Sequence, residues 1–171
     1  MKNILKLNNN SYLKIIIPDE PQFLPDDIEI WLITNDEKEC IFHDSFSYSV
    51  LVDVKTVFED FQNGKLQKPN AQALFAPQYA KMIQSNALTH NLDKHLLFTR
   101  QKYMLWLSTD THHDAILEFA KVDIEEDPIT YTKSCLFSID CDEFCRWMEQ
   151  LLSFDRRSDL LLERIRLMNC I

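Results

Sequence analysis

The densest group of potential metal ligands lies in segment 110–114, which reads Asp-Thr-His-His-Asp. Neutral imidazoles and carboxylates bind transition metals, and a loop could aim two or three of them at one ion. Adjacent side chains of an extended chain point to opposite sides, so His112 and His113 would not converge naturally. The sequence also has no H-E-x-x-H pattern. We therefore expect a polar turn here, with a metal site near Asp110–Asp114 as the alternative.

The cysteines form a second group with potential chemistry. Cys141 and Cys145 are four residues apart, so they would share one face of a helix, and Cys135 is near in sequence. Zinc sites commonly contain C-x2-C knuckles, and the sequence has none. In a reducing compartment such thiols behave as small hydrophobic side chains. We expect no bound metal at these residues.

Gly64 is the only glycine among the 171 residues. A Walker-type phosphate loop, a Rossmann fingerprint and the Ser-containing nucleophile elbow each need at least two glycines. Cys40 and His43 could serve as a nucleophile and its base. However, the sequence indicates no orienting third group and no oxyanion hole. The sequence therefore predicts a protein that is not an enzyme, with no catalytic residues and no cofactor.

Acidic residues outnumber basic ones by 27 to 18, which gives a formal net charge of −9. That charge repels phosphate backbones and disfavours nucleic-acid binding, whereas it attracts a basic protein and speeds the encounter. Paired carboxylates could also serve glycoside hydrolysis or simply be solvated. We expect partner-binding residues in three clusters: Asp19, Glu20, Asp26 and Asp27 in a proline-rich loop, Asp36, Glu37 and Glu39 in a turn, and Asp123, Glu125, Glu126 and Asp127 in another turn.

The elements that would position these residues follow from the period of the apolar side chains. In the N-terminal part, alternation predicts strands over 4–7, 12–17 and 28–34, and a strand pair or one long strand over 40–52. Asn8 to Ser11 would form the first turn, since asparagine tolerates positive φ. Asp53 would then begin a helix that Gly64 ends.

The rest of the chain alternates between strand and helix patterns. Pro77 fits the first turn of a short helix that runs to about Ala87. Strands are predicted over 96–100, 103–108, 115–125 and 130–139, with a helical reading of 115–125 left open. The strands between 96 and 108 are apolar on both sides, which indicates a sheet covered on both faces by helices or by a partner.

The C-terminal third predicts helices. Asp140 with Glu143 resembles a capping box, and Ser158 can cap a last helix through about Met168. A broad apolar stripe follows the first of these starts, formed by Phe144, Trp147, Met148, Leu151 and Leu152.

These elements predict one α+β domain over 1–171, with a core over 28–154 and a C-terminal helix over 155–171. We expect a mainly antiparallel sheet with helices packed on one face. No run of 18 apolar residues is present, so we expect no membrane contact. The N-terminus lacks a stretch that could be a signal peptide, which favours a cytoplasmic location.

Two strand-like runs that lead into amphipathic helices, 46–53 and 135–140, flank the alternation between Tyr103 and Ile124. Over residues 28–154 this design resembles the small immunity proteins that bacteria pair with polymorphic toxins, including those of contact-dependent growth inhibition. Such proteins tend to be acidic, cytoplasmic, single-domain α+β proteins without catalytic motifs. The resemblance implies that the protein binds and neutralises a cognate toxin, which would be basic if it is a nuclease. The alternative is a non-catalytic adaptor or chaperone-like binding module of a secretion system.

Overall fold

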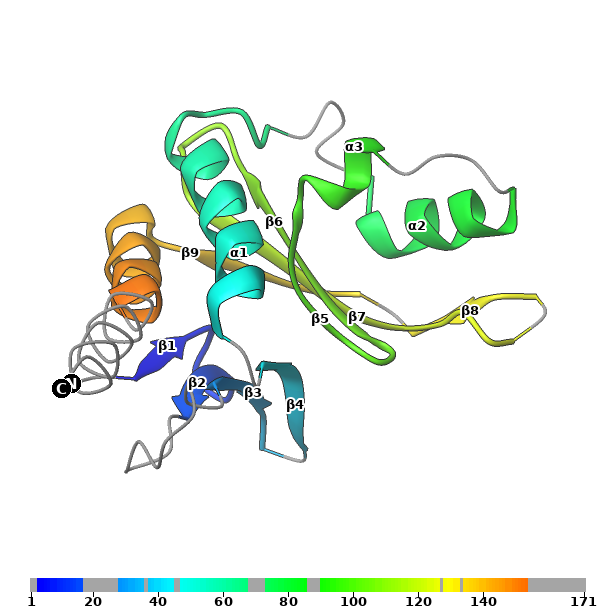
Figure 1. Cartoon of the computed structure of the whole chain (residues 1–171), viewed down its shortest axis with the longest axis horizontal. Coiled ribbons are helices and arrows are strands. Elements are labelled where there is room, and N and C mark those ends of the chain that lie inside the picture. Colours follow the sequence, from blue (N-terminus) through cyan, green and yellow to red (C-terminus); the bar gives the residue numbers. More distant parts are fainter. Residues whose placement is uncertain are drawn as a thin grey trace, which may run out of the picture.

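The chain folds into two antiparallel sheets with helices packed against them, as the computed structural model in Figure 1 shows. The structure describes residues 3–16, 28–35, 37–44, 47–67, 73–85, 90–126, 128–132 and 134–153. Apolar side chains of both sheets share one hydrophobic core. The α+β class predicted from the sequence is therefore confirmed.

The first sheet has the strand order β1-β2-β3-β4. Its strands are β1 (Ile4–Lys6), β2 (Tyr12–Ile16), β3 (Ile28–Ile33) and β4 (Lys38–Asp44). Alternation decides which face is buried, because Leu5, Leu13 and Leu32 pair across the sheet and all lie in the core. The expected turn at 8–11 is confirmed, and an asparagine side chain stabilises it: Asn8 Oδ1 accepts the N–H of Asn10 at 2.8 Å.

The strand predicted over 40–52 is wrong beyond β4, because helix α1 (Ser47–Gln62) begins six residues before the expected cap at Asp53. The residues from 47 to 50 alternate as a strand would, but the helical spacing of the residues that follow extends back into them. Tertiary packing on this helical face decides the outcome. The buried residues of this face are Leu51, Val54, Val57, Phe58 and Phe61.

Local sequence explains the ends of three helices. Gly64 follows α1 with a φ of 69°, as expected for a residue that ends a helix. Pro77 lies in the first turn of α2 (Phe75–Gln84), which confirms that prediction. A further helix covers the described residues 141–153, and the Asp140 carboxylate caps it by accepting the N–H of Glu143 at 3.0 Å.

The second sheet contains β5 (Leu96–Arg100), β6 (Tyr103–Thr109), β7 (Ala115–Asp123), β8 (Thr130–Tyr131) and β9 (Cys135–Ile139). The strand prediction for 115–125 is confirmed. The single strand predicted over 130–139 is instead divided into β8 and β9, which pair with different parts of β7. Tyr131 pairs with Val122, and Cys135 pairs with Phe119. Between these two pairs the chain of β8 and β9 advances by four residues, whereas β7 advances by three. One extra residue therefore interrupts the strand as a bulge would.

Both faces of β6 are covered. On β6, Leu105 and Leu107 face the core shared with the first sheet and α1, whereas Met104 and Trp106 pack in a second cluster with Phe75 of α2. This is the two-sided cover that the strands between 96 and 108 indicate. A short helix, α3 (His90–Asp93), leads into β5.

Helix 141–153 packs its predicted apolar stripe against the shared core. The Phe144 ring is fully buried, and its centroid lies 5.1 Å from that of Phe61 in an edge-on contact. Gln150 Nε2 donates to Asn3 Oδ1 at 2.6 Å, which ties this helix to the N-terminal segment. The predicted last helix from Ser158 lies outside the described residues. In the described segments, no helix is both long and apolar enough to span a membrane.

Candidate functional site

Strand β9 forms a border of the second sheet, because among the described strands it pairs only with β7. Its residues alternate between two environments. Phe137 and Ile139 are buried in the shared core, whereas Leu136 and Ser138 are exposed on the other face. The Leu136 side chain is 53% exposed, which is unusual for a large apolar residue. β9 therefore combines an edge that no other described strand covers with an exposed apolar side chain.

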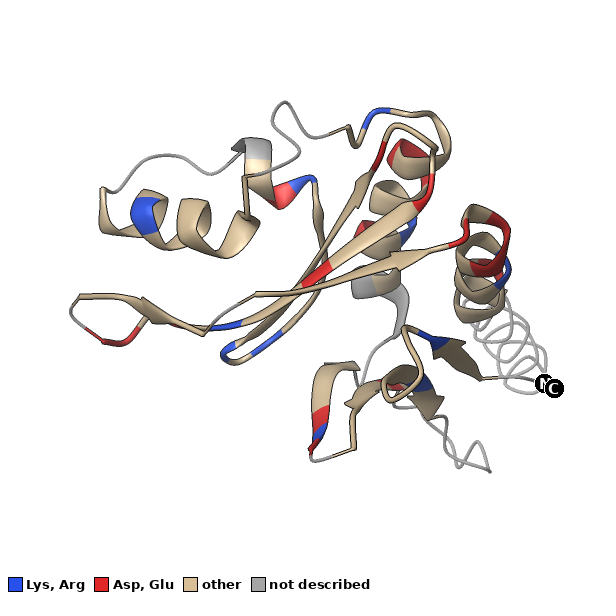
Figure 2. Cartoon of the chain, turned by 180° about the vertical axis from the view of Figure 1, so that it is seen from behind, with Lys and Arg blue, Asp and Glu red and all other residues tan. Residues whose placement is uncertain are grey.

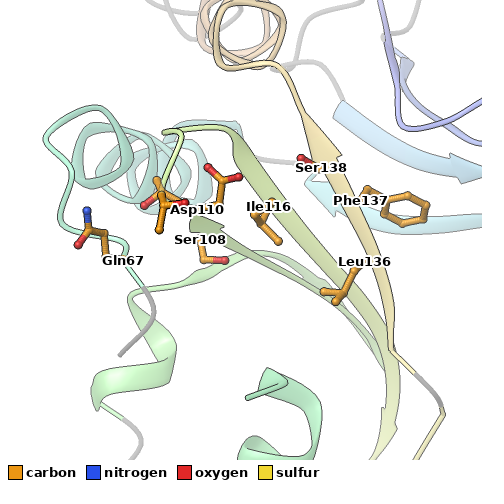
Figure 3. A pocket seen from close by; sticks show the side chains of 9 residues that line it. Gln67, Ser108, Asp110, Ile116, Leu136, Phe137 and Ser138 are labelled. Carbon is orange, nitrogen blue, oxygen red and sulfur yellow. The ribbon is translucent and has the colours of Figure 1, made fainter. Parts of the chain in front are cut away.

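A groove of about 470 Å³ lies on one side of β9 (Figure 3), and we call it the first groove. Ile116 and Leu136 form an apolar wall, while the Asp110 carboxylate and the Ser138 hydroxyl add polar groups. The Phe137 ring points away from this groove. The full lining consists of Gln67, Ser108, Thr109, Asp110, Thr111, Ile116, Leu136, Phe137 and Ser138.

A groove of about 420 Å³ lies between the two sheets on the other side of β9, and we call it the second groove. Its carboxylates are those of Glu37 and Glu39. Burial, and then a hydrogen bond with the Glu39 carboxylate, raises the pKa of the Tyr103 hydroxyl. The full lining consists of Asn8, Ser11, Leu32, Thr34, Glu37, Glu39, Phe119, Cys135, Leu136 and Phe137.

A buried carboxylate forms a hydrogen bond with the residue that precedes β9. Glu118 of β7 is 0% exposed, and its Oε1 accepts the hydroxyl of Ser134 at 2.9 Å and the N–H of Ala76 at 3.0 Å. Leu74, the residue before α2, makes no side-chain cap. Glu118 thus caps α2 from another element and fixes the residue that precedes β9.

The described members of the predicted acidic clusters lie in two separate places. Glu37 and Glu39 line the second groove, whereas Glu125 and Glu126 are exposed between β7 and β8, at the tip of a projecting hairpin (Figure 2). The Asp123 carboxylate is paired with Lys102, whose hydrogen bond lowers the pKa of Asp123. The remaining candidates lie outside the described residues: Asp19, Glu20, Asp26, Asp27, Asp36 and Asp127.

Another acidic region arises from strand register. Ala115 pairs with both Thr109 and Ile139, so Asp110, Asp114 and Asp140 follow at the same end of the sheet. Figure 2 shows further acidic segments at this end, where α1 ends and helix 141–153 begins. The residues of this region are far apart in sequence, so only the pairing of β6, β7 and β9 could have revealed it.

Segment 110–114 is the polar turn that the sequence favours. Asp110 Oδ1 accepts the N–H groups of His112 at 2.8 Å and Asp114 at 2.9 Å, and His113 has a φ of 67°. Both histidines are exposed. Within the described part of the chain, no three His, Cys, Asp or Glu side chains are grouped so that they could hold a metal ion.

The thiols of Cys40 and Cys145 are not activated. The Sγ atoms of Cys141 and Cys145 lie 4.0 Å apart on one helix face, as predicted. Burial, and then the neighbouring Cys141, raises the pKa of Cys145 to about 12. Burial also raises the pKa of Cys40, which is the opposite of what a nucleophile at neutral pH requires.

Alkylation should distinguish these thiols. Only the thiolate reacts, so at pH 8 we expect iodoacetamide to modify Cys145 at least about a hundredfold more slowly than the exposed Cys135. Site-resolved mass spectrometry at timed intervals measures both rates. Protein unfolded in urea is the control, in which the two rates should converge. Equal rates in the folded protein would contradict the burial of Cys145.

No family model matches the chain, and no curated protein or solved structure is similar enough to suggest a relative.

Proposed function

We propose that this protein binds a basic protein domain and acts as an immunity protein that neutralises a nuclease-type toxin. The observation that carries this proposal is the composition of the two grooves beside β9. Each combines apolar walls with carboxylates, Asp110 in the first groove and Glu37 and Glu39 in the second. Apolar area supplies affinity, and the carboxylates select a positively charged partner.

The charge of the whole chain supports the same role. A nuclease presents a basic cleft to its substrate, and a protein of net charge −9 is drawn toward such a surface. Binding over or beside the cleft would keep substrate out without any turnover. A stable complex of the two proteins is therefore sufficient for neutralisation.

The metal-dependent enzyme near Asp110–Asp114 is less well supported. The Asp110 carboxylate already accepts two backbone N–H groups of its own turn. These bonds hold the turn in shape and occupy an oxygen that a metal ion would need.

Co-expression tests the proposed function directly. The chain should rescue cells that express the toxin domain encoded immediately upstream, and the two proteins should co-purify as a complex. An unrelated toxin domain of similar charge is the control and should not be neutralised. Failure of both rescue and co-purification would refute the immunity function.

Removing the carboxylates of the second groove should slow association. At low salt we expect the double variant Glu37→Gln/Glu39→Gln to bind the toxin domain about tenfold more slowly, since electrostatic steering is weakened. The control variant Glu59→Gln/Glu149→Gln removes the same charge from exposed positions on α1 and helix 141–153. Stopped-flow association measures both, and the difference should shrink in 0.5 M salt, at a Debye length of about 4 Å. Equal slowing by the two variants would exclude a local role for the groove.

A further inference from the structure

We propose that the basic partner adds a β-strand to the open edge of β9, and that its successive side chains enter the two grooves alternately. This inference rests on the proposed function for the existence of the partner, and it specifies how that partner is held. Strand addition obtains affinity from main-chain hydrogen bonds and specificity from pockets for alternate side chains. β9 offers both.

The edge of β9 is regular. All five residues from Cys135 to Ile139 pair in register with β7, from Phe119 to Ala115, without an interruption. In such an antiparallel pair, the N–H and C=O groups of every second residue point away from the neighbouring strand. These outward groups are a template for another strand.

β9 also lacks the features that protect a sheet border. Its sequence, Cys-Leu-Phe-Ser-Ile, contains no charged residue and no proline. Charged residues, especially lysine, and short length commonly blunt an edge. The other border strands are short or charged. Strand β8 has only two residues. Strands β1, β4 and β5 each contain a basic residue, namely Lys6, Lys38 and Arg100.

The grooves lie where an added strand would place its side chains. Neighbouring strands of a sheet lie about 4.8 Å apart, and their side chains project from the same two faces. Leu136 and Ser138 project to the side of the first groove, and Cys135 and Phe137 project to the side of the second. Consecutive residues of the added strand would therefore enter the first and the second groove in turn.

The groove walls select long basic side chains. Ile116 and Leu136 offer apolar surface to the methylene stem of a lysine or arginine. The Asp110 carboxylate, whose Oδ1 accepts two N–H groups of its own turn, adds negative charge that attracts the charged head. In the second groove, Phe119 and Leu32 offer the apolar surface and Glu37 and Glu39 the charge. In the first groove, Thr109 adds a polar group, because its buried Oγ1 has no hydrogen-bond partner among the described residues. Because consecutive residues enter different grooves, the matching strand carries basic residues at adjacent positions.

Amide exchange tests the geometry with a defined probe, an eight-residue peptide that repeats Lys-Lys-Val-Val and so presents lysines to both grooves. In NMR hydrogen exchange, every second amide of β9 should exchange rapidly in the free protein and become at least tenfold protected with peptide. A peptide N-methylated at every residue cannot donate main-chain hydrogen bonds from either edge and should bind at least tenfold more weakly. Equal binding of both peptides, protection elsewhere than β9, or no binding at millimolar peptide would overturn strand addition.

A matched pair of variants tests the same edge with the toxin domain. Leu136→Lys places a positive charge between the grooves, and we expect it to weaken the complex at least tenfold. Ile4→Lys makes the same change on border strand β1, where the side chain is similarly exposed, at 47% against 53%. It should weaken the complex less than twofold. Melting temperatures of both variants should match the wild type, which separates loss of binding from loss of folding. Equal effects of the two substitutions would overturn the proposal.

The two hypotheses fail in different ways. Rescue by the wild-type chain, together with unchanged binding of Leu136→Lys, would reject strand addition and leave the immunity function intact. Protection of β9 by the lysine-valine peptide without any rescue would reject the immunity function and leave the strand acceptor.

Discussion

Replacing Phe144 with alanine is expected to lower the free energy of unfolding by about 4 kcal/mol. The ring is 0% exposed, and it contacts Phe61 and Phe58 edge-on at centroid distances of 5.1 and 6.2 Å. Its removal leaves a cavity between α1 and helix 141–153, which surrounding side chains can fill only in part. Urea denaturation followed by circular dichroism, with linear extrapolation, measures the change.

Ile124→Ala is the control for this substitution. Ile124 is also a large apolar residue, but its side chain is 49% exposed on the hairpin between β7 and β8. We expect a loss within about 0.5 kcal/mol there. A loss below about 1 kcal/mol for Phe144→Ala would show that helix 141–153 does not contribute to the shared core as the structure indicates.

The second large effect is expected for Glu118→Ala, at about 3 kcal/mol. The substitution removes the acceptor of one buried donor, the Ala76 N–H, and of one partly buried donor, the Ser134 hydroxyl. It also leaves space beside Trp106, the residue opposite Glu118 on β6. Buried donors without an acceptor lose their hydration without compensation. Urea denaturation measures the loss, and faster amide exchange in α2 should accompany it because the helix loses its cap.

Two milder variants identify the cause. Glu118→Gln keeps an acceptor oxygen and the side-chain volume, so we expect it to lose no more than about half as much stability. Ser134→Ala removes one of the two donors and should cost about 1 kcal/mol. If Glu118→Ala unfolded at the wild-type urea concentration, the carboxylate would have no structural role.

Alternation made most strands predictable. In β3, Ile28, Ile30 and Leu32 are buried while the residues between them are partly exposed, as the sequence pattern indicates. The cap at Asp140 and the helix end at Gly64 were equally readable, because each depends on local backbone geometry that a single residue type favours.

The start of α1 was not predictable from the same pattern. From Phe46 to Val50 the chain alternates apolar and polar residues, and the run to Val52 is rich in residues that favour strands. Leu51 and Val54 are nevertheless buried on one helix face together with Phe58. Contacts with distant strands decided the conformation, and a window of local sequence contains no information on those contacts.

The candidate site was predictable only in kind. The sequence indicated acidic groups for a basic partner, and Glu37 and Glu39 do line a groove. It did not indicate that Asp110 would lie on the other side of β9, or that residues 130–139 would be interrupted. Both outcomes depend on the register of β7 with three other strands, which is fixed only when the sheet is assembled.

The regular edge of β9 has a consequence for how such a protein could diversify. Main-chain groups have the same chemistry at every residue, so mutation leaves strand addition itself almost unchanged. The groove side chains, by contrast, can be exchanged without touching the shared core, as exposed Leu136 and Ser138 illustrate. A lineage could therefore acquire a new partner through a few groove substitutions and still bind it through main-chain hydrogen bonds to β9.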